Sequence, residues 1–418
     1  MAFLPHARRW PLPAVLAAWF LLSPRSGVLP IETDYAEPGW EICLDWTRQN
    51  GSDAKVADTR DNMGIPDRDQ SARKEYEETL KAYRELARKD SETYLPYVAI
   101  TLNELGILDS GQNRIEDARK EFEEALKIYR ELAQKSPARY LPNLAITLNN
   151  LGMLDGDKSL TEEALKTFRE LARKNPETYL PQVAATLNNL GILNSAQNRV
   201  NEARKEHEEA LRTYRRLTQK DSETYLPYVA LTLDNLALLD SARNQIKEAR
   251  KEYEDALKIY RELADKNPET YPAYVAKTLN NLGMLDLNQS RIEEALKTYR
   301  ELAQKKPQTF LPKVALTLNN LGILDSIENR MAEARNEYEE ALKTYREFAR
   351  KNPESYLPDV ALTLTNLGML DSDQNRTAEA RKEYEEALKI LEDFAKQDPE
   401  QYTTDVKRLK KLLEELPK

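Results

Sequence analysis

The sequence predicts an all-α protein, an α-solenoid built from antiparallel helix pairs. Ala, Leu, Glu, Lys and Arg dominate the 418-residue chain, which has only 12 Gly, and this composition favours helix over sheet. Apolar residues recur three or four positions apart, as on one face of a helix. A Tyr-Leu-Pro string or a close variant opens seven successive segments, at Tyr94, Tyr140, Tyr179, Tyr225, Tyr271, Phe310 and Tyr356.

These strings define a tandem array with two levels of repetition. Successive starts lie 46, 39, 46, 46, 39 and 46 residues apart, so the order 46-39-46 occurs twice with a period of 131 residues. A fixed period of this length is typical of stacked supersecondary units. We therefore predict seven repeats, at residues 94–139, 140–178, 179–224, 225–270, 271–309, 310–355 and 356–401. The 131-residue period indicates that a block of three repeats was duplicated as a unit.

Each repeat is predicted to contain two amphipathic helices. In the first repeat, residues 98–108 carry the apolar stripe of the first helix, and residues 115–133 carry that of the second. Pro96 suits the first turn of the first helix, where its missing N–H costs nothing. Gly106 lies inside that helix and indicates a close helix crossing. Pro137 closes the repeat.

The two 39-residue repeats lack a block of seven residues. Aligned on Glu-Ala-Leu-Lys, they have no equivalent of residues 118–124. Removing seven residues shortens a helix by about 10.5 Å but rotates its faces by only ~20°, so the apolar stripe survives. In the repeats that start at Tyr140 and Tyr271, we expect second helices about two turns shorter and notches on the outer surface.

The repeat unit resembles the tetratricopeptide repeat. The resemblance rests on Leu-Gly in the first helix, on the Ala118, Phe122, Ala125 ladder in the second, and on the proline that follows. The long unit and the Thr-Leu-Asn-Asn-Leu-Gly string look most like the kinesin-light-chain-like subtype. The resemblance covers roughly residues 54–416. It implies a right-handed superhelical α-solenoid whose first helices line a concave surface.

Both ends of the chain depart from the repeat pattern. Residues 54–93 are predicted to be a degraded N-terminal repeat, with a sound helix over 72–89, and residues 402–418 a C-terminal capping helix. Residues 1–53 form a leader foreign to the array. Its Arg8-Arg9 pair and the apolar run 11–22 have the order of a signal peptide, but the run contains two prolines and no small-x-small cleavage pair follows. A disordered leader and a misassigned start are the alternatives.

Composition excludes several classes of function. The chain carries 62 basic against 71 acidic residues, whereas nucleic-acid binders usually show a basic excess. The single Cys43 rules out a disulfide framework and a Cys-based metal cluster, and two histidines leave almost nothing from which to build a zinc site or a His-dependent triad. No phosphate-binding Gly loop or nucleophile elbow is present, and His207 is expected at the edge of a helix stripe. We therefore predict a non-enzymatic protein without cofactor, small-molecule substrate, nucleic-acid partner or stable transmembrane span.

An asparagine pair recurs in the first helix and is the candidate binding feature. Because Asn is a mediocre helix former, its repeated use needs a reason. One amide can pair with both polar groups of a peptide unit, so a ladder of amides in the concave groove would hold an extended peptide backbone. The alternative is that one Asn of each pair bonds the neighbouring helix and sets the stacking geometry. The residues are Asn103, Asn149, Asn150, Asn188, Asn189, Asn235, Asn280, Asn281, Asn319, Asn320 and Asn366.

Selectivity would come from variable residues on the same helix face. Tyr97, Tyr228, Tyr274 and Lys277 are the candidates that we assign to peptide binding. Only Lys277 and Lys313 fit a clamp for a carboxylate terminus. An internal, partly apolar peptide segment is therefore favoured over a charged chain end.

A carboxylate recurs three residues after the glycine, where the family usually has an aromatic residue. We expect a structural role, in which these side chains pair with Arg114, Arg199, Arg291, Arg330 or Arg376 at the turn between helices, and a cation site is the alternative. The series is Asp109, Asp155, Asp240, Asp286, Asp325 and Asp371, with Asn194 in the third repeat.

The predicted function is a protein–protein interaction scaffold or adaptor. Such a protein would bind an extended peptide or a partner protein in its concave groove. A regulatory sensor arm that acts with a separate signalling or protease effector is the alternative. The expected location is the cytoplasm, or outside it if residues 1–27 are a true signal peptide.

Overall fold

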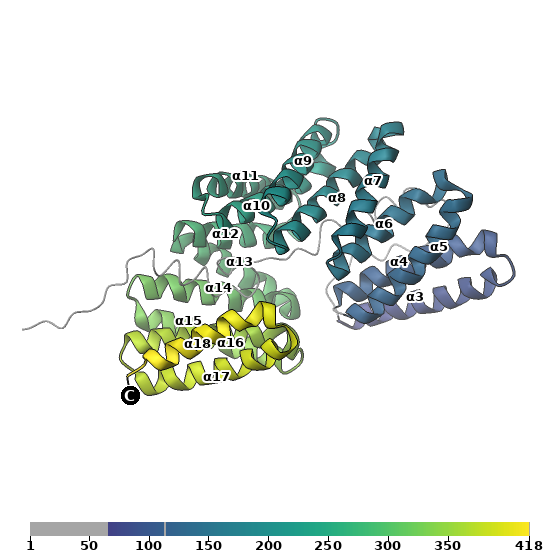
Figure 1. The fold of residues 1–418 in the computed structure, drawn as a ribbon. Coiled ribbons are helices and arrows are strands. Elements are labelled where there is room, and N and C mark those ends of the chain that lie inside the picture. The colour runs from purple at the N-terminus through teal and green to yellow at the C-terminus, as the bar shows by residue number, and fades with distance from the viewer. Residues whose placement is uncertain (1–65, 113, 418) are drawn as a thin grey trace, which may run out of the picture. The chain divides into compact units, whose positions relative to one another are not determined.

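The fold is taken from a computed structural model of the chain, which describes residues 66–417 except Asn113. The predicted leader, its signal-like run and the first helix of the degraded repeat lie outside the described residues. The described residues form sixteen α-helices and no strand (Figure 1). They divide into two compact units, and the boundary along the chain lies between Leu239 and Asp240 in the last turn of α10.

The N-terminal unit contains successive helices that pack on one another in sequence order from α3 to α9. Short turns join them, so neighbouring helices run antiparallel. The helices are α3 (Pro66–Ala87), α4 (Ser91–Gly111), α5 (Ile115–Lys135), α6 (Pro137–Asp155), α7 (Lys158–Lys174), α8 (Pro176–Ala196), α9 (Val200–Thr218) and α10 (Ser222–Ala242).

The C-terminal unit has the same organisation from α11 to α18. The predicted all-α array of helix pairs is thus confirmed in each unit. The helices are α11 (Ile246–Lys266), α12 (Pro272–Asp286), α13 (Gln289–Lys305), α14 (Pro307–Ile327), α15 (Met331–Ala349), α16 (Pro353–Asp373), α17 (Thr377–Gln397) and α18 (Pro399–Glu415).

The first helices begin earlier than the Tyr-Leu-Pro string. In α4, Asp90 caps the N-terminus by accepting a hydrogen bond from the backbone N–H of Thr93, and the helix starts at Ser91. Pro96 is therefore inside the helix rather than in its first turn, which corrects the prediction. The prolines that suit a first turn are those after the preceding helix. Pro137, predicted to close a repeat, opens α6.

The helices at the two ends also differ from their predicted bounds. α3 runs from Pro66 to Ala87 instead of 72–89, and α18 begins at Pro399, before the predicted 402. Leu409 and Leu416 of α18 are buried, as the capping stripe requires.

The short repeats lose their seven residues on both sides of the turn. α7 and α13 have 17 residues, against 19 or 21 in the second helices of the long repeats. The prediction of a loss of two turns from the second helix alone is therefore wrong. α6 also ends two residues short of α4, and its turn has two residues instead of three. Shortening both helices keeps the ends of the hairpin level, so each apolar stripe still faces its partner.

Glycine allows the predicted close crossing of the two helices in a repeat. A Cβ atom placed on Gly106 would lie 2.8 Å from the ring of Phe122. Gly322 and Gly368 meet Tyr338 and Tyr384 in the same way. These aromatic rings are buried and form the centre of each hairpin.

Candidate functional site

The asparagine pairs form a ladder of hydrogen bonds between successive first helices. The second Asn of one repeat donates from Nδ2 to Oδ1 of the first Asn in the repeat before it. The bonds are Asn150 to Asn103 (3.3 Å), Asn189 to Asn149 (3.2 Å), Asn235 to Asn188 (3.2 Å), Asn320 to Asn280 (3.0 Å) and Asn366 to Asn319 (3.0 Å). Asn281 accepts from Nδ2 of its neighbour Asn280 at 3.4 Å.

Burial of these side chains fits the stacking interpretation. Ten of the eleven predicted asparagines are buried, and Asn235 is half-buried. Thr147 adds a hydroxyl bond to Asn103 at 3.2 Å. Because a buried amide that loses its partner costs about 1–3 kcal/mol, these contacts fix the register between repeats. A peptide backbone would have to displace them before it reached the amides.

Three predicted tyrosines stack on tyrosines of the preceding repeat. Tyr97 of α4 lies 5.3 Å from Tyr83 of α3, measured between ring centroids, with 23° between the ring planes. The equivalent pairs are Tyr228 with Tyr214 at 5.4 Å and Tyr274 with Tyr260 at 5.2 Å. Each of Tyr97, Tyr228 and Tyr274 is half-buried. Stacking holds one edge of a large aromatic side chain fixed while another part stays accessible.

The remaining predicted residue, Lys277, is only 9% exposed on α12. The equivalent residues of the other repeats are buried at Ile146, Ala185 and Leu231 and half-buried at Ile100, Leu316 and Leu362. Residues 181–194 of α8 are buried on every side. The partly accessible surface of the first helices therefore lies mainly one turn before the asparagines, at the tyrosine positions.

The recurrent aspartates are held by arginines from two elements. Asp109 accepts from Nε of Arg73 on α3 and from Nε of Arg114 in its own turn, both at 3.0 Å. In the same way, Arg335 and Arg376 both contact Asp371. Both carboxylates are fully buried. The charge pair joins the two helices of one repeat and ties them to the second helix of the repeat before.

The predicted arginine partners are confirmed at four turns. Arg114, Arg291, Arg330 and Arg376 contact their aspartates. Arg199 is the exception. It contacts Gln197, while Asn194 donates to Glu206 at 2.6 Å. No group of three or more His, Cys, Asp or Glu side chains suited to a metal ion occurs in the described part of the chain.

His207 lies deeper than the sequence suggested. It is 2% exposed and lies against Gly191, where sister repeats place Phe or Tyr. Its Nδ1 donates to Oδ1 of Asn188 at 3.0 Å. Burial lowers the pKa of His207 to about 3, so the ring is neutral and serves as a core side chain.

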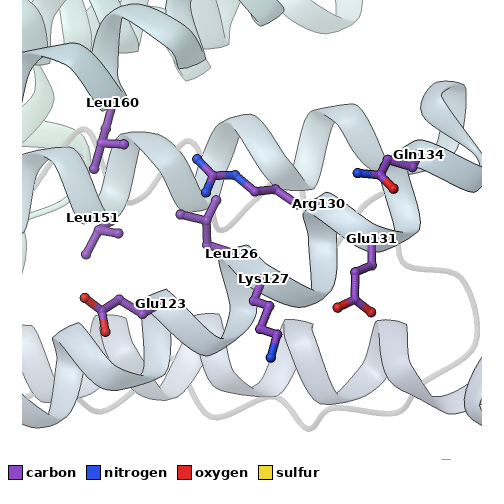
Figure 2. A pocket seen from close by; sticks show the side chains of 8 residues that line it. All are labelled: Glu123, Leu126, Lys127, Arg130, Glu131, Gln134, Leu151 and Leu160. Carbon is purple, nitrogen blue, oxygen red and sulfur yellow. The ribbon is translucent and has the colours of Figure 1, made fainter.

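Notches occur at both short repeats, as predicted. The first is a cavity of about 450 Å³ beside α5, and Figure 2 shows charged side chains of α5 around leucines of α5, α6 and α7. The second, of about 400 Å³, lies at the positions 131 residues later. The linings are Glu123, Leu126, Lys127, Arg130, Glu131, Gln134, Leu151 and Leu160, and Glu254, Leu257, Lys258, Arg261, Glu262, Asp265, Leu282 and Arg291.

The notches offer little to a ligand. Leu126, Leu151, Leu257 and Leu282 at their floors are buried core residues. Arg261 on the rim already pairs with a glutamate, Glu294, at 2.8 Å. Each notch is a consequence of the shortened hairpin rather than a built site.

Sequence reasoning missed one recurrent group, a glutamate one position before the aromatic of the second helix. Glu121, Glu337 and Glu383 are half-buried, although the sequence suggested a solvated face. The only sequence signal is that the 46-residue repeats have this glutamate and the 39-residue repeats have Leu160 or Arg291 in its place.

None of the described helices combines the length and apolar content needed to cross a membrane.

Comparisons with known proteins agree with the repeat architecture. Two models described as tetratricopeptide repeat match the chain, one at residues 143–216 and 274–347, the other at 98–136, 229–268 and 360–393. Together these segments cover more than half of the chain. No curated protein matches it.

Several solved structures are similar in fold. BtubC (BKLC) from P. vanneervenii is 21% identical over 57% of this chain and 91% of its own, with a TM-score of 0.44. The apo form of RapI is 17% identical over 67% of this chain and 95% of its own, with a TM-score of 0.46. A tetratricopeptide repeat protein from Parabacteroides merdae is 16% identical over 76% of this chain and 97% of its own, with a TM-score of 0.40.

Proposed function

Because the chain belongs to the tetratricopeptide repeat family, we propose that it is a non-enzymatic scaffold that binds an extended segment of a partner protein along its first helices. Tetratricopeptide repeats are protein–protein interaction modules, and the repeated helix pairs support that general role. The finer part of the proposal concerns where the partner binds and which side chains it contacts.

The observation that carries the proposal is the set of stacked tyrosine pairs. Tyr97, Tyr228 and Tyr274 occupy one equivalent position in three repeats, and each is half-buried against a second tyrosine. Aromatic side chains held rigid in this way are common anchors at protein interfaces, because little side-chain entropy is lost on binding. Regular anchors of this kind suit a partly apolar internal segment.

The asparagines have an indirect role in this proposal. Their bonds keep successive first helices in register, and that register sets the spacing of the tyrosines. Direct contact between the amides and a peptide backbone is a separate prediction, because the buried amides already bond one another.

Selection from a random peptide library tests the binding surface. Affinity for the selected peptide should fall about tenfold or more in Tyr97→Ala or Tyr228→Ala, because each change removes an aromatic anchor. Lys258→Ala is the matched control, since this exposed side chain lies on a second helix and should leave affinity unchanged. If the control and the tyrosine variants bind alike, the proposed surface is wrong.

A second variant separates the two roles of the amides. Asn189→Ala with Asn281→Ala should lower the melting temperature but leave the affinity of the folded protein within about threefold. A loss of affinity above tenfold in folded protein would instead favour direct contact between amide and peptide.

The alternative of a sensor arm makes a different prediction about partners. Such a protein recognises one dedicated effector, so a peptide library would yield no binder that depends on the tyrosines. An excess of library binders without sequence preference would favour the general scaffold. The exclusion of nucleic acid and small-molecule partners stays a prediction, as does the cytoplasmic location.

A further inference from the structure

Three long repeats carry a glutamate twelve residues after an arginine-bound aspartate. The aspartate ends the first helix and the glutamate lies near the start of the second, so both face the turn end of the hairpin. The glutamates are Glu121 of α5, Glu337 of α15 and Glu383 of α17. Among the described residues, Oε2 of each of these is a buried atom without a hydrogen-bond partner. An ionised carboxylate oxygen in such a place is costly, because neither water nor a donor solvates it.

Repeat six shows most directly how the two groups interact. The carboxyl group of Asp325 is placed to share a hydrogen bond with that of Glu337, and this raises the pKa of Glu337. Two ionised carboxylates have no hydrogen to donate, so this bond needs one proton. The other charged groups that face Glu337 are Arg330 in the turn and Glu293 on α13. Arg330 is engaged with Asp325 at 2.8 Å, and Glu293 adds further negative charge.

The first repeat has the same arrangement. Glu121 faces Asp109 of α4, Arg73 of α3, Arg114 of the turn and Asp117 of its own helix. Both arginines bond Asp109, whose carboxylate is fully buried. The positive charge is therefore directed to the aspartate, and the glutamate is left as the group that holds a proton.

In the seventh repeat the surroundings of the glutamate are more positive. Glu383 faces Arg335 and Glu339 of α15, Arg376 of the turn and Glu379 of its own helix. The two arginines also contact Asp371.

We propose that each of these three repeats holds a proton at its aspartate–glutamate pair, and that loss of the proton loosens the turn end of the hairpin and its junction with the preceding repeat. The charged cluster includes Arg73 or Arg335 from that preceding repeat, or Glu293 in repeat six, so an added negative charge acts on both contacts. The array would then be a pH-responsive scaffold in which the long repeats that hold this pair respond and the short repeats do not.

The pKa values of the glutamates agree with this arrangement. Burial, followed by the charge of Asp109, raises the pKa of Glu121 to about 8. Burial and the bond to Asp325 raise the pKa of Glu337 to about 9. Burial raises the pKa of Glu383 to about 7, where Arg335 and Arg376 oppose the rise.

The chain contains its own comparison sites. In the third repeat Asn194 replaces the aspartate and donates to Glu206 at 2.6 Å. Burial raises the pKa of Glu206, and the hydrogen bond from Asn194 opposes that rise, so no second carboxyl group has to share a proton there. The short repeats have Leu160 and Arg291 at the glutamate position. Neither short hairpin contains the pair, and both serve as internal controls.

Hydrogen exchange of the intact protein between pH 5.5 and 10, corrected for intrinsic exchange, tests the proposal. Exchange at the turn ends 109–121, 325–337 and 371–383 should lose protection by up to tenfold per pH unit, and level off above about pH 8, 9 and 7 respectively. The hairpins 155–161 and 286–292 should keep constant protection. Glu337→Gln should abolish the change at 325–337 and leave the change at 371–383.

A second measurement on the wild-type protein guards against a variant that does not fold. Carbon-13 NMR of labelled glutamate carboxyl groups should show at least three groups that are protonated at pH 6 and titrate between pH 7 and 9. The proposal is overturned if all glutamates titrate near pH 4.5, or if short and long hairpins lose protection equally.

Discussion

The two copies of the duplicated block, residues 94–224 and 225–355, build the same hairpins with different side chains at their tightest points. Opposite a helix glycine, the short repeats place Thr161 in one copy and Ile292 in the other. The third repeat of each block places His207 or Tyr338 opposite glycine. Helix length and the small residue at the crossing therefore determine the hairpin geometry, and the side chain that packs against the small residue can vary.

One difference between the copies involves two residues that contact each other. Asn194 donates to Glu206 in the first copy, whereas Asp325 and Glu337 share a hydrogen bond in the second. In the first copy the glutamate accepts a hydrogen bond from an amide. In the second copy we propose that a proton is held between the two carboxyl groups. In both copies the glutamate at this position has a polar side chain of the first helix beside it, an amide donor in one and a carboxyl group in the other.

The largest expected effect is the acid stability of the first copy. Burial lowers the pKa of His207 to about 3, so the native state binds fewer protons than the unfolded state. Its contribution to stability is present above pH 6.5 and is lost as pH falls towards 3. His207→Phe, which places the side chain of Phe122 at this position, has no such pH dependence. Between pH 7 and pH 4 the free energy of unfolding of the wild type should therefore fall by about 3 kcal/mol more than that of the variant. Denaturant titration at both pH values measures this, with Tyr338→Phe as a control that should show no pH-dependent gain.

The charge pair of the second copy gives the next largest effect. Asp325→Ala should cost about 2 kcal/mol, because the buried carboxylate that Arg330 and Glu337 contact is removed while Arg330 keeps partial access to water. Asn194→Ala should cost about half as much, since it removes one hydrogen bond and no charge pair. Thermal unfolding of both variants tests the ranking, and an equal cost would show that the charge adds nothing.

Thr161 offers a gain in stability. Its hydroxyl is buried and has no hydrogen-bond partner in the described residues, whereas Ile292 fills the same space in the second copy without a polar atom. Thr161→Val should therefore stabilise the protein by about 1 kcal/mol. Thr147→Val is the matched control. That hydroxyl bonds Asn103 at 3.2 Å, so its removal should destabilise the protein. A loss in both variants would contradict the assignment of an unpaired hydroxyl.

The smallest expected effect lies in the turn of the short repeats. The first copy has Gly156 at a φ of +67°, and the second has Leu287 at +51°. A left-handed leucine costs about 1–2 kcal/mol, which glycine avoids at an entropic cost of about 0.5–1 kcal/mol. Leu287→Gly should thus raise stability by about 0.5 kcal/mol, and Gly156→Leu should lower it. Opposite signs in denaturant titrations would confirm that the turn geometry is shared.

Several features of the fold follow from local sequence patterns. The repeat periods, the helix pairs, the glycine crossings and the aspartate–arginine turns depend on residues close in sequence, and their interpretation agrees with the structure. Helix starts were less accurate, because the capping role of Asp90 depends on a single side-chain bond to the backbone. The loss of seven residues was assigned to one helix because an alignment has no information on how two helices share a deletion.

The candidate site was harder to predict, because one helix face satisfies two interpretations. From the sequence, Asn150 and Asn189 could point into a groove or toward a neighbouring helix. Their hydrogen bonds to Asn103 and Asn149 show that they contact the neighbouring helix. Glu121 was read as solvated because its helix neighbours are charged. Its charged surroundings include Asp109 of α4 and Arg73 of α3, which lie 12 and 48 residues away in sequence.

By itself, the amino-acid order determined how many hairpins this protein has, which two are short, and that all are helical. Those properties depend on residue spacing within one chain segment, because a helix has 3.6 residues per turn and so places apolar residues three or four positions apart on one face. Only the tertiary structure decided which asparagine side chains bond each other, which tyrosine rings are half-buried by stacking, and which carboxyl groups we propose to be protonated. Each of these depends on contacts between different helices, and the amides that meet at 3.0 Å are 40 or 47 residues apart, so they approach only after the hairpins have stacked.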